Sequence, residues 1–134
     1  GMPDYLSISN FINQIKELSR DTVEDIKYLN VGNLEVARDF IYVDDFIDIL
    51  WRLSQESSAY GEVYNVCSGK PLSLKKIVEY MIILSGEKIT IKQQRSRMRK
   101  ADMKIHFGDN KKILSVIGKV NFTDWKKGIE EMFE

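Results

Sequence analysis

Cysteine, histidine and long apolar runs are scarce in this sequence of 134 residues. Its single cysteine, Cys67, excludes an internal disulfide, and an apolar, strand-like run around it favours a buried structural thiol over a nucleophile. The single histidine, His106, has no cysteine or histidine companion at metal-ligand spacing, which argues against a zinc site. No apolar run approaches the ~20 residues of a membrane-spanning helix, and the first residues lack the pattern of a secretion signal. We therefore expect a cytoplasmic protein with no membrane partner.

Charge is balanced over the whole chain but unevenly distributed along it. Twenty basic and twenty acidic residues give a formal net charge of zero. Residues 1–62 carry twelve acids against five bases, whereas residues 88–112 carry nine bases against two acids. The basic stretch either attracts phosphate or is a solvated loop, and charge alone leaves both open. It lacks the interleaved aromatic residues that stack on bases, so we expect no nucleic-acid partner.

Periodicity and capping residues predict alternating helices and strands. Five helices are expected to begin near Ser7 or Ser9, at Asp44 or Asp45, at Ser73, at Asp109 and at Thr123. Four short strands are expected over residues 26–31, 38–43, 62–67 and 89–92. A turn is expected over residues 68–71, and the helix that begins at Ser73 is expected to end at Gly86. The helix over residues 46–53 is apolar on all sides, which predicts burial on more than one face. With no linker or internal repeat, the pattern indicates one α/β domain over residues 1–134.

Arg38 is the first candidate for binding an anionic small molecule, because it shares the face of a predicted strand with Phe40 and Tyr42. Arginine binds phosphate through two parallel hydrogen bonds. For Arg38 considered alone, a salt bridge to a neighbouring acid is the competing interpretation. In the basic loop, Arg97 and Arg99 lie two residues apart, so in an extended backbone both reach one ligand from the same side. The remaining carboxylates of this stretch are interpreted as strand-end and helix-cap residues rather than an acid/base pair: Asp39, Asp44 and Asp45.

Four motifs occur in a fixed order and together resemble a known family. They are V-G-N-L-E-V-A-R-D-F-x-x-V-D-D, G-E-V-Y-N-V-C-S-G, R-x-R-x-x-D and G-D-x-K-K. This set resembles the C-terminal part of the extended short-chain dehydrogenases/reductases, the NAD-dependent epimerase/dehydratase family. Within it, the chain is most similar to the GDP-4-dehydro-6-deoxy-mannose reductases and GDP-mannose 4,6-dehydratases. The resemblance implies an α/β substrate-binding portion of about four short strands and five helices, without the dinucleotide-binding Rossmann half.

The resemblance also implies a site for a nucleotide-diphosphate sugar. It places Arg38 and Arg99 on the diphosphate, with Arg97 as a helper. Asp102 is then expected to bond a ribose hydroxyl. The turn that contains Asn33 and Leu34 is expected to lie near the nucleotide.

The catalytic signatures of the same family are absent from this sequence. It has no G-x-G-x-x-G turn for the pyrophosphate of a dinucleotide and no Tyr-x-x-x-Lys pair for proton transfer. NAD or NADP is thus implied for the full-length enzyme, and neither a cofactor nor a catalytic residue is expected in this chain. We predict the GDP-mannose-type binding portion of an NAD(P)-dependent epimerase, dehydratase or reductase, as a truncated product or split-enzyme subunit. The alternative is a non-enzymatic assembly module that forms a homodimer or pairs with a separate dinucleotide-binding chain.

Overall fold

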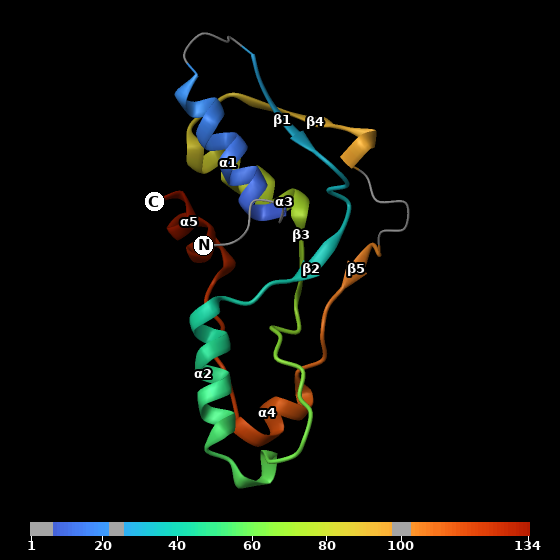
Figure 1. Cartoon of the computed structure of the whole chain (residues 1–134), viewed down its shortest axis with the longest axis vertical. Coiled ribbons are helices and arrows are strands. Elements are labelled where there is room, and N and C mark those ends of the chain that lie inside the picture. The colour runs from blue at the N-terminus through green and yellow to red at the C-terminus, as the bar shows by residue number, and fades with distance from the viewer. Residues whose placement is uncertain (1–6, 22–25, 98–102) are drawn as a thin grey trace. The chain divides into compact units, whose positions relative to one another are not determined.

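Helices and short strands alternate along the chain in the computed structural model, which describes residues 7–21, 26–97 and 103–134 (Figure 1). The described helices are α1 (Ser7–Arg20), α2 (Val43–Ser54), α3 (Leu74–Ser85), α4 (Lys111–Ile117) and α5 (Trp125–Phe133). The described strands are β1 (Lys27–Val31), β2 (Ala37–Asp39), β3 (Pro71–Ser73), β4 (Ile89–Gln93) and β5 (Ile105–His106). Two single turns of 3-10 helix are η1 (Ser57–Ala59) and η2 (Arg95–Arg97). All five predicted helices are confirmed.

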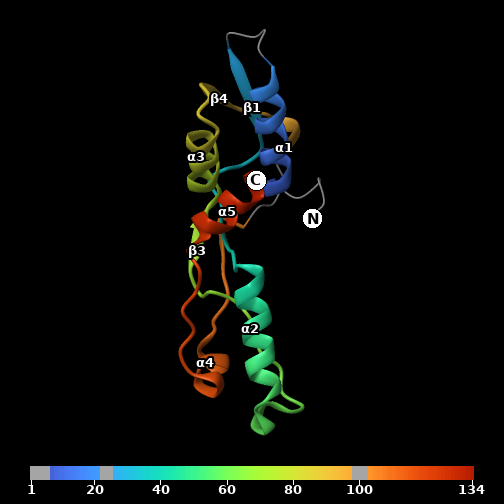
Figure 2. The same ribbon diagram turned by 90° about the vertical axis from the view of Figure 1, so that its left-hand side faces the viewer.

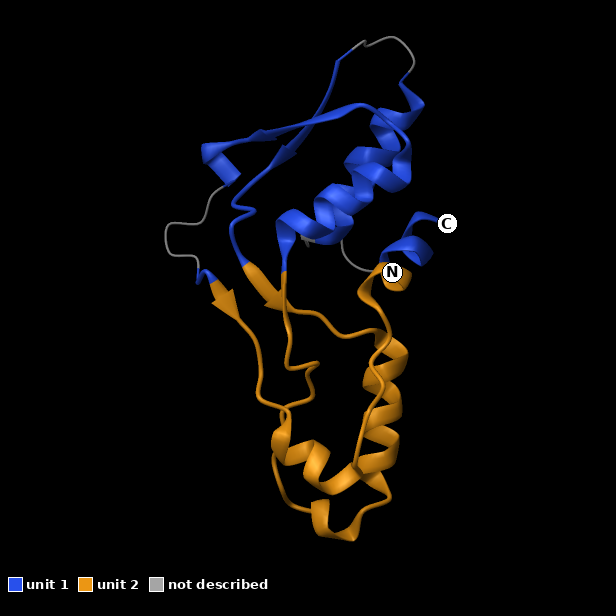
Figure 3. Cartoon of the chain, turned by 180° about the vertical axis from the view of Figure 1, so that it is seen from behind, with its two compact units in different colours: residues 1–36, 73–104, 129–134 blue, residues 37–72, 105–128 orange. Residues whose placement is uncertain are grey.

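The chain divides into two units, which Figure 3 draws in different colours. Unit 1 takes in residues 1–36, 73–104 and 129–134. Unit 2 takes in residues 37–72 and 105–128. The single domain expected over residues 1–134 stays a prediction.

Unit 1 is built on the parallel pair of strands β1 and β4, in which Leu29 lies opposite Ile91. A parallel pair needs a crossover connection, and α3 lies within the segment that leads from one strand to the other. Helices α1 and α3 lie side by side in both views of the chain (Figures 1 and 2). Their apolar faces form a core with β1, whose fully buried side chains include Ile15, Leu29, Val31, Ile77, Val78 and Met81. The helical spacing that predicted α1 and α3 therefore marks their buried faces.

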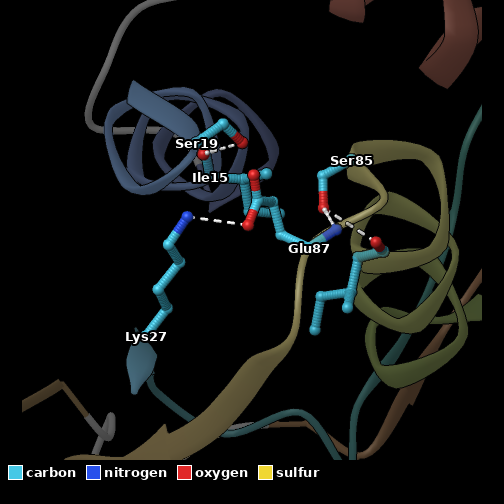
Figure 4. Close-up of polar contacts among 6 residues, drawn as sticks. Ile15, Ser19, Lys27, Ser85 and Glu87 are labelled. Atoms are coloured by element: carbon cyan, nitrogen blue, oxygen red, sulfur yellow. Dashed lines mark hydrogen bonds and ion pairs between the residues drawn. The ribbon is translucent and has the colours of Figure 1, made fainter. Parts of the chain in front are cut away.

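An ion pair joins the start of β1 to the segment that precedes β4. Lys27 Nζ lies 2.7 Å from Glu87 Oε2, and their side chains are 13% and 30% exposed (Figure 4). Helix α3 is capped at its C-terminal end by Gly86, the residue before Glu87. The φ of Gly86 is 69°, the left-handed conformation that glycine adopts without strain. The predicted end of that helix is confirmed.

Unit 2 contains helices α2 and α4 and most of a three-stranded sheet. The strand order in this sheet is β3-β2-β5. Strands β2 and β5 are parallel, and their register pairs Ala37 with Ile105 and Arg38 with His106. Helices α2 and α4 contribute one buried side chain each, Ile49 and Ile113. These features place Arg38 on a short central strand.

Two of the predicted strands are corrected by the structure. Residues 62–67 form no strand and lie outside both sheets. Lys112 Nζ donates to the Val63 carbonyl at 2.9 Å instead, so a side chain takes the place of a neighbouring strand. The strand expected over residues 38–43 ends at Asp39, because α2 already begins at Val43. Conversely, the expected turn at Pro71 is the start of β3.

The predicted burial of α2 is wrong. Ile49 is its one buried residue among those described, and Trp51 is 67% exposed. Within unit 2, α4 is the helix with the most extensive contact to α2. Because α4 is only 7 residues long, it leaves much of the apolar surface of α2 exposed.

Two predicted helix caps, those of α2 and α4, differ in detail. The residue before α2 is Tyr42, and Asp44 and Asp45 lie in its first turn. Asp45 instead accepts hydrogen bonds from the backbone N–H (2.7 Å) and hydroxyl (2.8 Å) of Thr123, so it anchors the segment before α5. Asp109, one residue earlier than the position before α4, accepts from the N–H of Lys111 at 2.9 Å.

Candidate functional site

The carboxylate of Asp39 joins three of the sequence motifs within unit 2. Its Oδ1 accepts from the backbone N–H (2.9 Å) and the hydroxyl (2.6 Å) of Ser68. Its Oδ2 accepts from the N–H of Gly69 at 2.9 Å and of Gly108 at 3.3 Å. Asp39 belongs to the R-D-F motif, Ser68 and Gly69 end the second motif, and Gly108 starts the G-D-x-K-K motif. The end of β2, beside Arg38, is therefore held by hydrogen bonds from two other segments of the chain.

Asn110 and Gly108 complete this junction. Asn110 Nδ2 donates to the carbonyls of Cys67 (3.2 Å) and Ser68 (3.0 Å). Gly108 lies so close to Cys67 that a Cβ added to it would be 2.4 Å from Sγ, which no real contact allows. Residue 108 therefore has room for glycine alone.

The thiol of Cys67 is half-buried at this junction. Burial raises the pKa of the Cys67 thiol, and the negative charge of Asp39 raises it further. A raised pKa lowers the thiolate fraction at a given pH, and the thiolate is the reactive form. These contacts support the structural role expected of Cys67.

We expect a thiol-reactive dye to label folded Cys67 more slowly than Cys67 in the urea-unfolded chain. The difference should be several-fold at about pH 8, because burial and the raised pKa both reduce the accessible thiolate. The release of the dye's chromophore measures both rates, and the single cysteine makes the unfolded rate an internal reference. Equal rates would contradict the half-buried, negatively charged environment of Cys67.

Arg38 lies on β2 as a half-buried residue. Its Nη1 donates to the carbonyl of Ala37 at 2.9 Å, which aligns the side chain with its own strand. Its register partner on β5 is His106, which is exposed. The parallel strands β2 and β5 thus bring two basic side chains to one face of the sheet, because register partners point to the same side.

In unit 1, the turn at Gly32 packs against η2. A Cβ on Gly32 would lie 2.6 Å from the Arg97 carbonyl oxygen, so the two backbones are in direct contact. Asn33 Oδ1 accepts from the Glu35 N–H at 3.0 Å and closes the turn. The Leu34 side chain is only 4% exposed and belongs to the core, which leaves its backbone as the part able to meet a ligand.

Arg97 is held in a polar network beside this turn. Its Nε donates to Gln94 Oε1 at 3.1 Å, and its Nη1 donates to Asn10 Oδ1 at 3.2 Å and to the Asn30 carbonyl at 3.3 Å. Gln14 adds bonds to Asn10 and to both backbone groups of Asn30. The structure therefore brings Arg97 to the Gly32 turn, as one residue of a structural network.

Of the predicted site residues, Arg99 and Asp102 lie outside the described residues. Arg38 belongs to unit 2, whereas Asn33, Leu34 and Arg97 belong to unit 1. Sequence reasoning missed the roles of Ser68, Gly108 and Asn110, for which the motif letters S-G and G-D-x were the available signal. Across the described ranges, no three acidic, histidine or cysteine side chains gather into a metal site. Within the same residues, no helix is long and apolar enough to cross a membrane.

Solved structures define the class of this fold. RMD from Pseudomonas aeruginosa, complexed with NADPH, matches with a TM-score of 0.85 and 26% identity, over 99% of this chain and 43% of that one. The UDP-glucuronic acid 4-epimerase of Bacillus cereus, in complex with NAD, matches with a TM-score of 0.73 over 96% of this chain and 36% of that one. Its identity is 18%, so it bears on the fold alone. The fold is the C-terminal portion of an extended short-chain dehydrogenase/reductase, as predicted.

Sequence comparison narrows this class to a family. A family model described as GDP-mannose 4,6 dehydratase matches residues 6–132, so the chain belongs to that family. The GDP-6-deoxy-D-talose 4-dehydrogenase of Aggregatibacter actinomycetemcomitans is 34% identical over 84% of this chain and 38% of its own length. The GDP-6-deoxy-D-mannose reductase of Pseudomonas aeruginosa is 26% identical over 98% of this chain and 46% of its own length. The chain thus spans less than half the length of these relatives, and the resemblance stated from its motifs is confirmed.

Proposed function

We propose that this chain binds a nucleotide-diphosphate sugar of the GDP-mannose type, as the substrate-binding part of an NAD(P)-dependent epimerase, dehydratase or reductase. The observation that carries the proposal is the placement of Arg38. It lies near the carboxyl end of β2, and the four hydrogen bonds to Asp39 fix the backbone beside it. Membership of the GDP-mannose 4,6 dehydratase family supports the choice of ligand class.

The position of Arg38 suits a ligand for a general reason. In open α/β sheets, ligands bind in the crevice beyond the carboxyl ends of the strands. Strands β2 and β5 are parallel, so their carboxyl ends meet at one edge, close to Arg38 and His106. Arginine is the side chain that best matches the paired oxygens of a diphosphate.

The remaining roles belong to the same proposal. Arg99 supplies the second contact to the diphosphate, and Asp102 bonds a ribose hydroxyl. Arg97 is a helper at the diphosphate and is itself held by its bonds to Gln94 and Asn30, while the Asn33–Leu34 turn lies near the nucleotide. NAD or NADP serves the full-length protein and is held outside this chain, which has no glycine-rich dinucleotide turn.

Substitution of either arginine is expected to weaken ligand binding. In calorimetric titration of the chain with GDP-mannose, Arg38→Ala and Arg99→Ala should each reduce the binding free energy by about 2 kcal/mol, the range of a charge-assisted hydrogen bond. Asp102→Asn should have a smaller effect, because an amide still accepts from a hydroxyl. Binding that is indifferent to both arginine substitutions would remove the proposed site.

A second candidate function is an assembly module, and α2 is the observation that favours it. The exposed apolar side chains on this helix are Val43, Phe46, Ile47, Leu50 and Trp51. Contiguous apolar surface of this kind marks interaction sites in soluble proteins. A second copy of the chain or a separate dinucleotide-binding chain would cover it.

Sedimentation should therefore show self-association that depends on α2. We expect the chain to form dimers as its concentration rises, and Trp51→Lys to return it to a monomer, because a charge in an apolar interface is not compensated. Ile83→Lys is the matched control, since Ile83 is 72% exposed but lies on α3. A monomer at every concentration, or equal effects of both substitutions, would count against the module.

A further inference from the structure

Arg38 and His106 lie beside each other in the sheet of unit 2, and His106 lies outside all four sequence motifs. The two residues are direct register partners in the parallel pair β2 and β5. Neighbouring strands lie roughly 4.8 Å apart, so the side chains of such partners leave one face of the sheet next to each other. His106 is exposed and Arg38 is half-buried. The only histidine of the chain therefore stands beside the arginine proposed to hold the diphosphate.

Two of the described residues close to His106 are basic. Arg38 faces it from β2, and the exposed Lys104 comes two residues before it on its own segment. Among the described acids close to His106, Asp39 alternates to the opposite face of β2 and is bonded to Ser68, Gly69 and Gly108. Asp109 accepts from the backbone of Lys111. β3, on the other side of β2, carries no ionisable side chain.

A protonated imidazole directly opposite a guanidinium is unfavourable, because like charges across a strand pair repel. An anion placed over both groups removes that repulsion and gains two charge-assisted hydrogen bonds. Histidine acquires its positive charge within the range of about pH 5 to 8, unlike the other basic side chains. The pair is thus arranged so that a bound anion favours protonation of His106.

We propose that His106 contacts the same anionic ligand as Arg38, and that ligand binding strengthens as His106 becomes protonated. This inference rests on the proposed function, because it takes the diphosphate of a nucleotide-diphosphate sugar as the anion. That diphosphate is esterified at both ends and keeps its charge constant between about pH 5 and 8, so a change in affinity over this range reports on the protein.

The test is calorimetric titration of the whole chain with GDP-mannose at about pH 5.5 and at about pH 8, which bracket the ordinary titration of histidine. We expect binding to be about tenfold tighter at the lower pH, a change equivalent to about 1.4 kcal/mol. His106→Gln should abolish this pH dependence, because glutamine carries no charge at either pH. Lys119→Gln, which removes an exposed cation of the same unit, should preserve it.

A second measurement reads His106 without relying on affinity differences. The ring protons of the only histidine give an unambiguous NMR signal, and we expect them to titrate at a higher pH when GDP-mannose is present. Binding that depends on Arg38 but shows no pH dependence, or a ring that titrates identically with and without ligand, would overturn this inference alone. Absence of binding at both pH values would overturn the proposed function and the inference with it.

Discussion

Replacing Asp39 with alanine is expected to lower the free energy of unfolding by about 3–5 kcal/mol, near the upper end for a single substitution. The carboxylate accepts three backbone N–H bonds and one hydroxyl bond, from Ser68, Gly69 and Gly108. Hydrogen bonds to a charged group contribute more than neutral ones, and their removal leaves donors without partners. Loss of Asp39 therefore releases three chain segments from one another.

Urea-induced unfolding, followed by circular dichroism, measures this effect. Asp44→Ala is the matched control, because Asp44 is an exposed carboxylate in the first turn of α2. Removing it should affect only the helix dipole, by about 0.3–1 kcal/mol. Equal stability of the two variants would show that the Asp39 junction does not hold unit 2 together.

Alanine at position 108 is the second substitution with a large expected effect, a loss of about 3 kcal/mol, as overpacking produces. The added Cβ would lie 2.4 Å from Cys67 Sγ and 3.0 Å from Cys67 Cβ. One of the two backbones must then move, and both carry hydrogen bonds, since Gly108 donates to Asp39 and the Cys67 carbonyl accepts from Asn110.

A double-mutant cycle isolates this clash from other effects of the substitution. In a Cys67→Ala background the sulfur contact is gone, so Gly108→Ala should be less destabilising there than in the parent chain. The remaining contact to the Cys67 Cβ should keep part of the loss. Identical losses in both backgrounds would contradict the close packing of Gly108 on Cys67.

The helices were predictable because their signals are local. The i, i+3, i+4, i+7 spacing of α3 identifies Leu74, Ile77, Val78 and Met81, which are all buried. Gly86 ends the helix in the left-handed conformation that the sequence predicts at that place. Each of these inferences needs information from within two or three turns.

The strands were harder to predict because pairing depends on distant residues. Alternation over residues 62–67 predicts a strand, yet these residues belong to neither described sheet. Strand β5 spans two residues and is recognisable only through its partner β2. A single-sequence pattern contains no information on which extended segments meet.

The candidate site was predictable only in part, because some of its contacts are local and others join distant residues. The R-D-F motif made Arg38 a candidate, and its role as a ligand contact stays a prediction. Asp39 was correctly interpreted as a strand-end residue, since β2 ends there. The hydrogen bonds of Asp39 were not foreseen, because Ser68 and Gly108 are 29 and 69 residues away. The register that pairs Arg38 with His106 is likewise a property of the folded chain.

Calorimetric titration with GDP-mannose tests the role of Arg38 when two charge-removing substitutions are compared. Arg38→Gln and Lys119→Gln each remove one positive charge from unit 2, so their long-range electrostatic effects are matched. We predict that Arg38→Gln reduces the binding free energy by about 2 kcal/mol, whereas Lys119→Gln leaves it unchanged. Equal affinity of the two variants would contradict the assignment of Arg38 to the diphosphate.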